Sequence, residues 1–278
     1  EQGGILRFTS QLPLPSFNPN SGEVKLTPLS PLLELASVCV TFGALRAVDG
    51  VSLAVAPGER RAIIGPNGVG KTTLFNAIAG ETPVSDGTVR YAGEDVTSKR
   101  AHQRAARGIG RTFQITNLFG GLSVEENLRL AVLGNDQRKF ALFANPADPA
   151  AVREAIDVAL ERTGLAPKRA MPIRAISYGE QRQLELAMAL ASRPRLLLLD
   201  EPAAGLSPAE RVRMAEIIRG LPRDLTLVLI EHDMELALGL VDRVTCLHFG
   251  QVLVEDTPDG IRGNAKVQEV YLGRRHHA

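Results

Sequence analysis

One stretch of eight residues carries the clearest chemical signal in the chain. Residues 65–72 read Gly-Pro-Asn-Gly-Val-Gly-Lys-Thr, so two glycines five positions apart are followed by a lysine and a hydroxyl residue. A glycine-rich turn of this spacing directs backbone N–H groups inward, and the helix that follows adds the partial positive charge of its N-terminus. Lys71 would supply a point charge for the β- and γ-phosphates of a nucleotide, and Thr72 would ligate the Mg²⁺ that bridges them. The predicted phosphate loop therefore comprises Gly65, Pro66, Asn67, Gly68, Val69, Gly70, Lys71, Thr72 and Thr73.

The segments on either side of this loop agree with the prediction. Residues 61–64 have the pattern of a short buried strand, and residues 74–79 have that of a helix closed by Gly80. The alternative is a glycine-rich turn that matches the pattern by accident. The order of strand, loop and helix favours the phosphate-binding interpretation.

Two adjacent carboxylates supply a second chemical signal. Four leucines at 196–199 precede Asp200 and Glu201, which predicts a strand buried on both faces that ends in two acidic side chains. Ligands bind at the carboxyl edge of parallel sheets, so Asp200 would hold Mg²⁺ through water and Glu201 would act as general base. An exposed acidic turn is the alternative. The phosphate loop upstream favours the catalytic interpretation.

A histidine follows the next predicted strand. Residues 225–230 form an apolar run that ends at Glu231, His232 and Asp233. His232 would then reach the same edge of the sheet, where a neutral imidazole could hydrogen-bond the γ-phosphate or the attacking water. By itself a lone histidine has little weight.

The segment Ser177-Tyr178-Gly179-Glu180-Gln181 allows a structural and a functional interpretation. Ser177 with Glu180 three residues later is a capping box that would open a helix through Leu190. A helix start whose first N–H groups face outward is also an anion site. Both interpretations are compatible, so Ser177 and Gly179 could bind a phosphate presented by another molecule.

An aromatic residue could complete a nucleotide site. Phe42 ends an apolar run beside Gly43, and its ring could stack on a purine. An ordinary core position is the alternative, and local sequence alone favours it.

The composition limits the class of protein. The chain has 278 residues, of which 44% are hydrophobic, and a net charge of +1 from interspersed acidic and basic residues. These values predict a soluble globular protein with no nucleic-acid partner. No run approaches the roughly 18 apolar residues that span a bilayer, so any work at a membrane would depend on other subunits. Cys39 and Cys246 are far apart in sequence and are expected to be buried thiols in a reducing cytosol.

The N-terminal part of the chain changes character near residue 32. Residues 1–31 are rich in Pro, Ser, Asn and Gly without periodicity, which predicts a linker or irregular extension. Short strands are expected at 32–40 and 51–55, separated by turns at Gly43 and at Asp49-Gly50. A further short strand is expected at 88–91.

The middle of the chain has helical patterns. Residues 99–111 are strongly basic with alanines at helical spacing, which favours a solvated helix face over a binding patch. Residues 123–133 and 148–163 also have helical patterns, opened by Ser123 with Glu126 and by Asp148-Pro149. A helical insert of about 70 residues, at about 99–172, is therefore expected within an α/β core.

Taken together, these motifs resemble those of ATP-binding cassette (ABC) ATPases. The resemblance covers residues 32 to about 273. It includes Gln114, which follows Ile109-Gly110-Arg111-Thr112-Phe113. It implies an α/β fold with a RecA-like P-loop NTPase core, an antiparallel β-subdomain and an α-helical insert. The domain would occupy 32–278, with a C-terminal tail at about 256–278.

The resemblance also implies roles for individual residues. It makes Phe42 an adenine-stacking residue, His232 a switch residue and Gln114 a Mg²⁺ ligand that reports to a membrane partner. It implies a head-to-tail dimer with a second ABC ATPase subunit, in which Lys71 of one subunit faces Ser177 of the other across ATP. This chain departs from the family pattern at two places. In the family's signature sequence, here Ser177–Gln181, Tyr178-Gly179 and Glu180 stand where the commonest form has two glycines and a glutamine. Ser207 stands where many relatives carry aspartate.

A finer resemblance is to the cytoplasmic ATPase subunits of bacterial importers for branched-chain and related hydrophobic amino acids. The segments on which this resemblance rests include Ser177–Gln181, Glu231-His232-Asp233-Met234 and the tail Val270-Tyr271-Leu272-Gly273. It implies ATP hydrolysis at the inner face of the cell membrane, with permease subunits and a solute-binding protein as partners. Related ATPases serve urea, amide or lipid transport, and a soluble non-transport ABC protein or a non-hydrolysing nucleotide-binding module is a further alternative.

Overall fold

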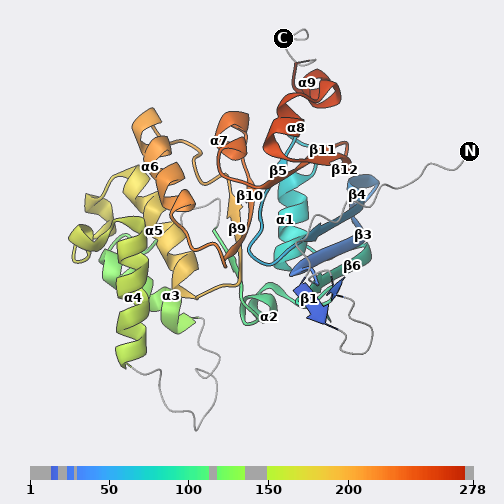
Figure 1. The fold of residues 1–278 in the computed structure, drawn as a ribbon. Helices are drawn as coiled ribbons and strands as arrows, with labels where there is room; N and C mark the ends of the chain where they lie inside the picture. Colours follow the sequence, from blue (N-terminus) through green and yellow to red (C-terminus); the bar gives the residue numbers. More distant parts are fainter. Residues whose placement is uncertain (1–13, 18–23, 28–29, 113–117, 135–148, 273–278) are drawn as a thin grey trace, which may run out of the picture.

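A six-stranded sheet runs through the centre of the protein in the computed structural model, which describes residues 14–17, 24–27, 30–112, 118–134 and 149–272 (Figure 1). The strand order is β12-β11-β5-β10-β9-β8, and only β12 runs antiparallel to its neighbour. The strands span β5 Arg60–Ile64, β8 Ile109–Arg111, β9 Leu196–Asp200, β10 Thr226–Ile230, β11 Arg243–His248 and β12 Gln251–Asp256.

The parallel strands explain why the candidate catalytic and phosphate-binding residues lie at one edge of the central sheet. All five residues of β5, of β9 and of β10 are buried, as expected for strands covered on both faces. Ile230 pairs with both Ile63 and Asp200, so the three strands end at the same level. The residues that follow each strand therefore meet at the carboxyl edge of the sheet.

A second, antiparallel sheet has the order β4-β3-β6-β7. Its strands are β3 Leu33–Phe42, β4 Leu45–Val55, β6 Asp86–Tyr91 and β7 Glu94–Asp95. Gly43 forms the expected turn, but the turn predicted at Asp49-Gly50 is wrong because β4 continues through it. Gly50 instead has φ +67° within a strand whose register with β3 shifts. The glycine therefore allows the backbone conformation that this irregular strand pairing requires.

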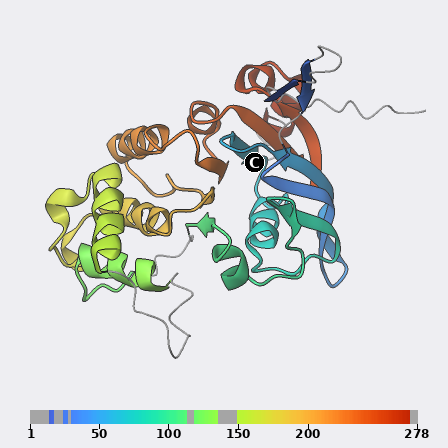
Figure 2. The ribbon, with the colours of Figure 1, turned by 60° about the horizontal axis from the view of Figure 1, so that its bottom comes forward.

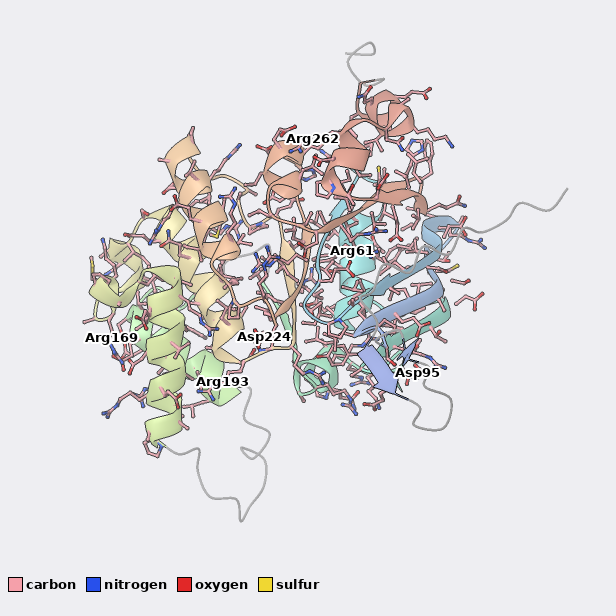
Figure 3. All side chains as sticks on the ribbon, in the orientation of Figure 1. Arg61, Asp95, Arg169, Arg193, Asp224 and Arg262 are labelled. Atoms are coloured by element: carbon pink, nitrogen blue, oxygen red, sulfur yellow. The ribbon has the colours of Figure 1, made fainter. Side chains whose placement is uncertain are left out.

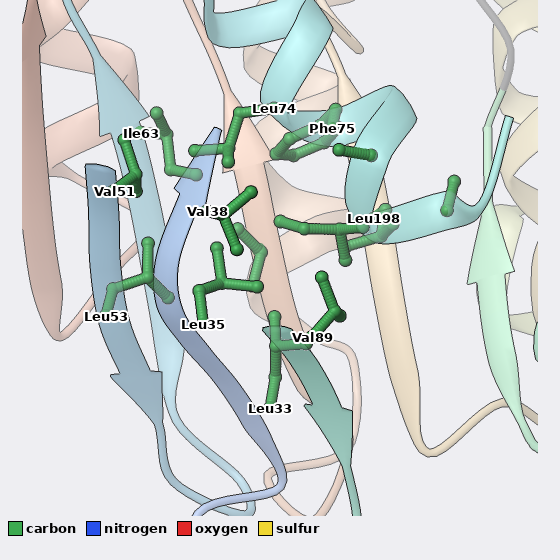
Figure 4. Packing of buried hydrophobic residues seen from close by; sticks show 14 of the residues in the cluster. Leu33, Leu35, Val38, Val51, Leu53, Ile63, Leu74, Phe75, Val89 and Leu198 are labelled. Atoms are coloured by element: carbon green, nitrogen blue, oxygen red, sulfur yellow. The ribbon is translucent and has the colours of Figure 1, made fainter. Parts of the chain in front are cut away.

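Helix α1, Lys71–Ala79, packs between the two sheets (Figure 4). Leu74 and Phe75 are fully buried and contact a cluster that includes Leu35 of β3 and Leu198 of β9. Burying one such side chain contributes about 1.5–3 kcal/mol, so this cluster fixes the helix that follows the phosphate loop. Gly80, with φ +80°, ends the helix as the sequence predicts.

The helical layer lies on the side of the central sheet opposite the antiparallel sheet (Figures 1 and 2). It contains α3 Val124–Gly134, α4 Pro149–Thr163, α5 Tyr178–Ala191 and the short 3₁₀ turns Ala166–Lys168 and Ile173–Ala175. The predicted apolar face of α4 is confirmed, because Val152, Ile156, Ala159 and Leu160 are all buried in one cluster. Ser123 and Glu126 also form their predicted reciprocal hydrogen bonds. The predicted N-cap Asp148 lies outside the described residues.

The predicted start of the helical insert at residue 99 is wrong. Helix α2 covers only Ala101–Ala105, and β8 pairs with β9 inside the central sheet. Arg104, expected on a solvated face, is 1% exposed and donates to the carbonyls of Ala77 and Ile78 at 2.6 and 2.7 Å. The basic pattern misled the prediction because this guanidinium binds the C-terminal carbonyls of α1, a contact with no local signature.

The remaining helices cover the same face of the central sheet as α5, opposite the face that packs against α1. They are α6 Pro208–Arg219, α7 Met234–Leu238, α8 Pro258–Arg262 and α9 Ala265–Leu272, and their apolar residues join α5 in one buried cluster. Cys246 lies buried in this cluster and Cys39 is half-buried in β3, both as free thiols. No helix in the described ranges combines the length and apolar character needed to cross a membrane.

Two strands occur in the N-terminal extension. β1 Leu14–Phe17 and β2 Val24–Thr27 pair antiparallel, with Leu14 opposite Thr27 and Phe17 opposite Val24. The prediction of an irregular extension is therefore wrong for these two segments. The prolines suggested a break, but a two-stranded sheet has only edge strands, and an edge strand tolerates a proline such as Pro15. The domain boundary near residue 32 stays a prediction.

Candidate functional site

A cavity of about 350 Å³ lies at the carboxyl edge of the central sheet. It brings together residues from the antiparallel sheet, the phosphate loop and the ends of β9 and β10. Its walls are formed by Phe42, Leu45, Ala47, Asn67, Gly68, Gly70, Lys71, Thr72, Thr73, Glu201 and His232. Residues predicted separately from four stretches of sequence therefore share one cavity.

Close backbone contacts require glycine at two positions of the phosphate loop. Gly65 and Gly70 have φ values of +147° and +97°, which side chains rarely adopt. A Cβ on Gly65 would lie 2.3 Å from the carbonyl oxygen of Leu247, and one on Gly70 would lie 2.1 Å from that of Ala47. The glycines thus allow the loop to turn close to neighbouring backbone and to lead directly into α1 at Lys71. The first N–H groups of α1 have no acceptor within the helix, so they can serve an anion.

Lys71 is held over the loop by two backbone oxygens. Its Nζ donates to the carbonyl oxygens of Gly65 and Pro66 at 2.7 and 2.8 Å, and the residue is only 5% exposed. These bonds span the turn and fix the position of the ammonium group. A triphosphate entering the cavity would therefore meet a preformed positive charge.

Glu201 and His232 are in close polar contact at the sheet edge. Nε2 of His232 lies 2.6 Å from Oε1 of Glu201, while the backbone N–H of Glu201 donates to the carbonyl of Ile230 at 3.0 Å. Glu201 has φ +50°, a left-handed conformation that is uncommon for a non-glycine residue. Such strain is retained where the surrounding structure fixes it, often at functional sites.

Asp200 is buried behind Glu201 and is partly paired. Arg111 binds Oδ2 of Asp200 at 3.1 Å and Oε2 of Glu81 at 2.8 Å. Burial raises the pKa of Asp200, and the Arg111 guanidinium opposes that rise. The second carboxylate oxygen, Oδ1, is buried without a hydrogen-bond partner among the described residues, so it keeps an acceptor for a cation or its water. Sequence analysis placed Arg111 in a basic run and missed this pairing.

Glu231 is a second buried carboxylate at this edge, and sequence analysis gave it no role. Burial raises its pKa to about 7, although backbone N–H groups of Ala203 and His232 oppose the rise. Oε1 of Glu231 accepts the N–H of Ala203 at 3.0 Å, which ties the end of β10 to the loop after Glu201. The only sequence signal was an acidic residue directly before His232.

Phe42 lies at the cavity and not in the core. It is 53% exposed at the end of β3, so the core position favoured by local sequence alone is wrong. An exposed ring beside a polar cavity can cover the face of a base. Gln114 lies outside the described residues, and the position of its side chain therefore remains a prediction.

The segment 177–181 lies apart from this cavity, since none of its residues is among the cavity walls given above. The predicted capping box is confirmed: Oγ of Ser177 accepts the N–H of Glu180 at 3.2 Å, and Glu180 accepts that of Ser177 at 2.9 Å. Tyr178 is 43% exposed, whereas Gly179 is buried so close to Glu210 that a Cβ would lie 2.3 Å from the carboxylate. Ser207 caps α6 with Glu210 in the same way.

Comparison with known proteins decides the family. A family model described as ABC transporter matches residues 48–204. The BraF protein of Pseudomonas aeruginosa, a high-affinity branched-chain amino acid transport ATP-binding protein, is 38% identical over 250 residues, which cover 87% of this chain and 98% of BraF. The chain belongs to the ABC transporter family. A second model, described as branched-chain amino acid ATP-binding cassette transporter, matches residues 251–277 of this ABC protein.

Further relatives agree with the assignment to the ABC family. The LivG protein of Escherichia coli K12, also a branched-chain amino acid transport ATP-binding protein, is 39% identical over 252 residues, with 87% and 98% of the two chains covered. A nucleotide-free ATP-binding cassette from an ABC transporter superimposes with a TM-score of 0.77 at 28% identity, over 87% of this chain and 98% of that one. The predicted α/β fold, with its RecA-like core, is thus confirmed.

Proposed function

We propose that this ABC protein is the ATP-hydrolysing subunit of a bacterial importer for branched-chain or related amino acids. It would bind at the inner face of the cell membrane through permease subunits, and a solute-binding protein would deliver the substrate. The observation that carries the proposal is the single cavity in which the phosphate loop faces Glu201 and His232. The similarity to BraF and LivG supports the class of substrate.

The geometry supports a direct displacement at the γ-phosphate. Phe42 would stack on adenine at one end of the cavity, and Lys71 with the first N–H groups of α1 would bind the β- and γ-phosphates. A water oxygen would attack the γ-phosphorus while the bond from phosphorus to the ADP oxygen breaks, and Glu201 would accept the proton that the water loses. His232, whose Nε2 lies 2.6 Å from Oε1 of Glu201, would hold that carboxylate in line with the water.

The chain also offers donors that fit Mg²⁺. Asp200 keeps the unpartnered, buried oxygen Oδ1, and Thr72 contributes a hydroxyl at the cavity wall. These are hard oxygen donors of the kind that Mg²⁺ prefers alongside phosphate and water, and Gln114 is proposed as a further ligand. When bound, the ion would offset the negative charge on the β- and γ-phosphates.

A head-to-tail dimer would complete the site. Ser177 and Gly179 lie at the capped start of α5, outside the cavity of their own chain. We propose that this helix start, with Tyr178, Glu180 and Gln181, covers the ATP of a second ABC ATPase subunit. Two solved structures of one cassette with the same fold are described as dimeric. Hydrolysis would then require closure of the dimer, and release of product would reopen it.

A second cavity suggests where a permease subunit would bind. It has a volume of about 340 Å³ and lies among α2, β8, α3 and α5, with mostly apolar walls that include Ala105, Ala131 and Met188. Arg111 lines it too, and the same guanidinium binds Asp200. A permease helix seated here would contact the residue that holds the catalytic edge of the sheet. Because Arg111 connects this cavity to the catalytic edge of the sheet, a permease subunit is favoured over an unrelated partner as the occupant.

The proposed function is tested by reconstitution. The chain would be combined with its permease subunits and solute-binding protein in vesicles, and uptake of labelled leucine, urea and lipid would be compared with MgATP supplied on the side of the ATPase. We expect leucine uptake coupled to phosphate release. Phosphate release stimulated by urea or lipid but not by leucine would overturn the proposed substrate class, and an absence of any phosphate release would overturn the enzymatic assignment.

A further inference from the structure

The C-terminal tail contacts the phosphate loop through one hydroxyl group. The backbone N–H of Gly65 donates to Oη of Tyr271 at 2.6 Å, although the two residues are 206 positions apart. Gly65 lies within the segment that matches the ABC transporter model, and Tyr271 lies within the separate segment that matches the branched-chain model. The hydrogen bond therefore joins the nucleotide-binding core to the tail.

The tail is firmly attached at the point where it makes this contact. Ile261 of α8 and Val267 of α9 are buried in the cluster that covers the central sheet, and Tyr271 packs against the same cluster. Arg262, labelled in Figure 3, binds Glu235 of α7 at 3.2 Å. The hydroxyl is thus presented to Gly65 by packed helices. Burial also raises the pKa of Tyr271 to about 12, so the group stays a neutral phenol at physiological pH.

The peptide groups of Gly65 are held from both directions. Its N–H is bound by Tyr271, and its carbonyl oxygen accepts the hydrogen bond from Nζ of Lys71 at 2.7 Å. The backbone of Leu247 lies so close that even a Cβ on Gly65 could not fit. Tyr271, Gly65 and Lys71 therefore form a continuous chain of hydrogen bonds that leads from the tail to the ammonium group over the loop.

We infer that Tyr271 is a positioning residue for the phosphate loop and that the tail thereby sets the affinity for ATP. The hydroxyl touches no substrate, and its effect passes through Gly65 to Lys71. Without it a buried N–H group would lose its partner, and the loop would be free to turn away from the conformation that Lys71 needs. The inference rests on the proposed binding of ATP at this loop.

The test is the variant Tyr271→Phe in the full-length chain, which removes the hydroxyl and keeps the ring. Loss of one net hydrogen bond corresponds to about a two- to tenfold weaker affinity, so we expect KM and Kd for MgATP to rise by that factor while kcat stays close to that of the wild type. The Gly65 amide proton should also exchange faster with solvent, as measured by NMR.

Tyr91→Phe is the matched control. Tyr91 is 2% exposed, and its hydroxyl donates to the carbonyl of Gly108 at 3.3 Å, remote from the phosphate loop. It should lower thermal stability to a similar degree but leave KM unchanged. An unchanged KM in Tyr271→Phe, or an equal rise in both variants, would overturn the inference while leaving the proposed function intact. Failure of the wild-type chain to bind ATP would instead overturn the proposed function.

Discussion

His232 and Glu201 are joined by a 2.6 Å contact between Nε2 and Oε1 across the ends of the neighbouring strands β10 and β9. The imidazole is 45% exposed and the carboxylate 18%, so both groups are accessible from the cavity. With a hydrogen on Nε2, the imidazole donates to the carboxylate and restricts its rotation. The pair therefore couples the position of the proposed base to the segment that follows β10.

The first prediction concerns this contact. His232→Ala removes a hydrogen bond to a charged group, which corresponds to about a ten- to hundredfold loss in the rate of ATP hydrolysis. Binding of MgATP should change much less, because the phosphate loop is untouched. Steady-state phosphate release by the isolated subunit gives the rate, and His102→Ala, an exposed histidine of α2 outside the walls of the nucleotide cavity, is the control. A normal rate in His232→Ala would show that the contact has no catalytic role.

The second prediction concerns the aromatic residue at the cavity. Phe42→Ala should weaken ATP binding about 5- to 150-fold, because stacking of a base on an aromatic ring contributes roughly 1–3 kcal/mol. Binding of inorganic triphosphate, measured by the same calorimetric titration, should stay unchanged. Phe249→Ala is a suitable control because Phe249 is 80% exposed and lies outside the cavity walls. Equal losses for ATP and triphosphate would contradict adenine stacking.

The third prediction follows from the buried carboxylate of Glu231. Its pKa is raised from 4.5 to about 7, so between these values the folded chain holds a proton that the unfolded chain has released. The free energy of unfolding must therefore fall as pH rises through this window, by roughly 3 kcal/mol from this group. Glu231→Gln keeps an oxygen for the N–H of Ala203 and removes the titration.

Denaturant unfolding at pH 5 and pH 8 measures this difference. From pH 5 to pH 8 the free energy of unfolding should fall for the wild type but not for Glu231→Gln, so the variant becomes more stable relative to the wild type at pH 8. Glu269→Gln, at an exposed position on α9, controls for the change in net charge. An equal difference between Glu231→Gln and the wild type at both pH values would contradict the assignment.

The fourth prediction concerns the proposed permease groove. Ala105→Trp would fill part of the 340 Å³ cavity from α2, so association with the permease should be lost while ATP hydrolysis by the isolated subunit continues. Ala106→Trp adds the same side chain at the adjacent exposed residue, which is not among the walls of the cavity. Co-purification with the permease measures the outcome, and retention of the permease by Ala105→Trp would rule the groove out as the docking site.

Features with strong local signals were predictable from the sequence. The four leucines before Asp200 form a fully buried strand, and Ser177 with Glu180 caps α5 as expected. Both signals come from residues within a few positions of one another, where periodicity and capping chemistry act directly. The fold class could be predicted for the same reason, because these local motifs occur in a characteristic order.

Contacts between distant segments were not predictable in this way. Arg104 binds carbonyls 26 and 27 positions away, and Arg111 binds Asp200 at a distance of 89 positions. In the sequence both appear as members of a basic run, since composition records charge but not the partner that burial selects. The hydrogen bond between Gly65 and Tyr271 belongs to the same class. The chemical roles of the cavity residues, and that of Gln114, stay predictions.

The most direct test of the proposed mechanism is the rate of phosphate release by Glu201→Gln, measured together with its ATP-dependent dimerisation by light scattering. The variant keeps the shape of the side chain but cannot accept the proton of the attacking water, so hydrolysis should fall about 10²- to 10⁴-fold. ATP binding and dimerisation should persist, and Glu216→Gln, an exposed carboxylate on α6, should behave as the wild type. Near-normal turnover in Glu201→Gln would contradict the account.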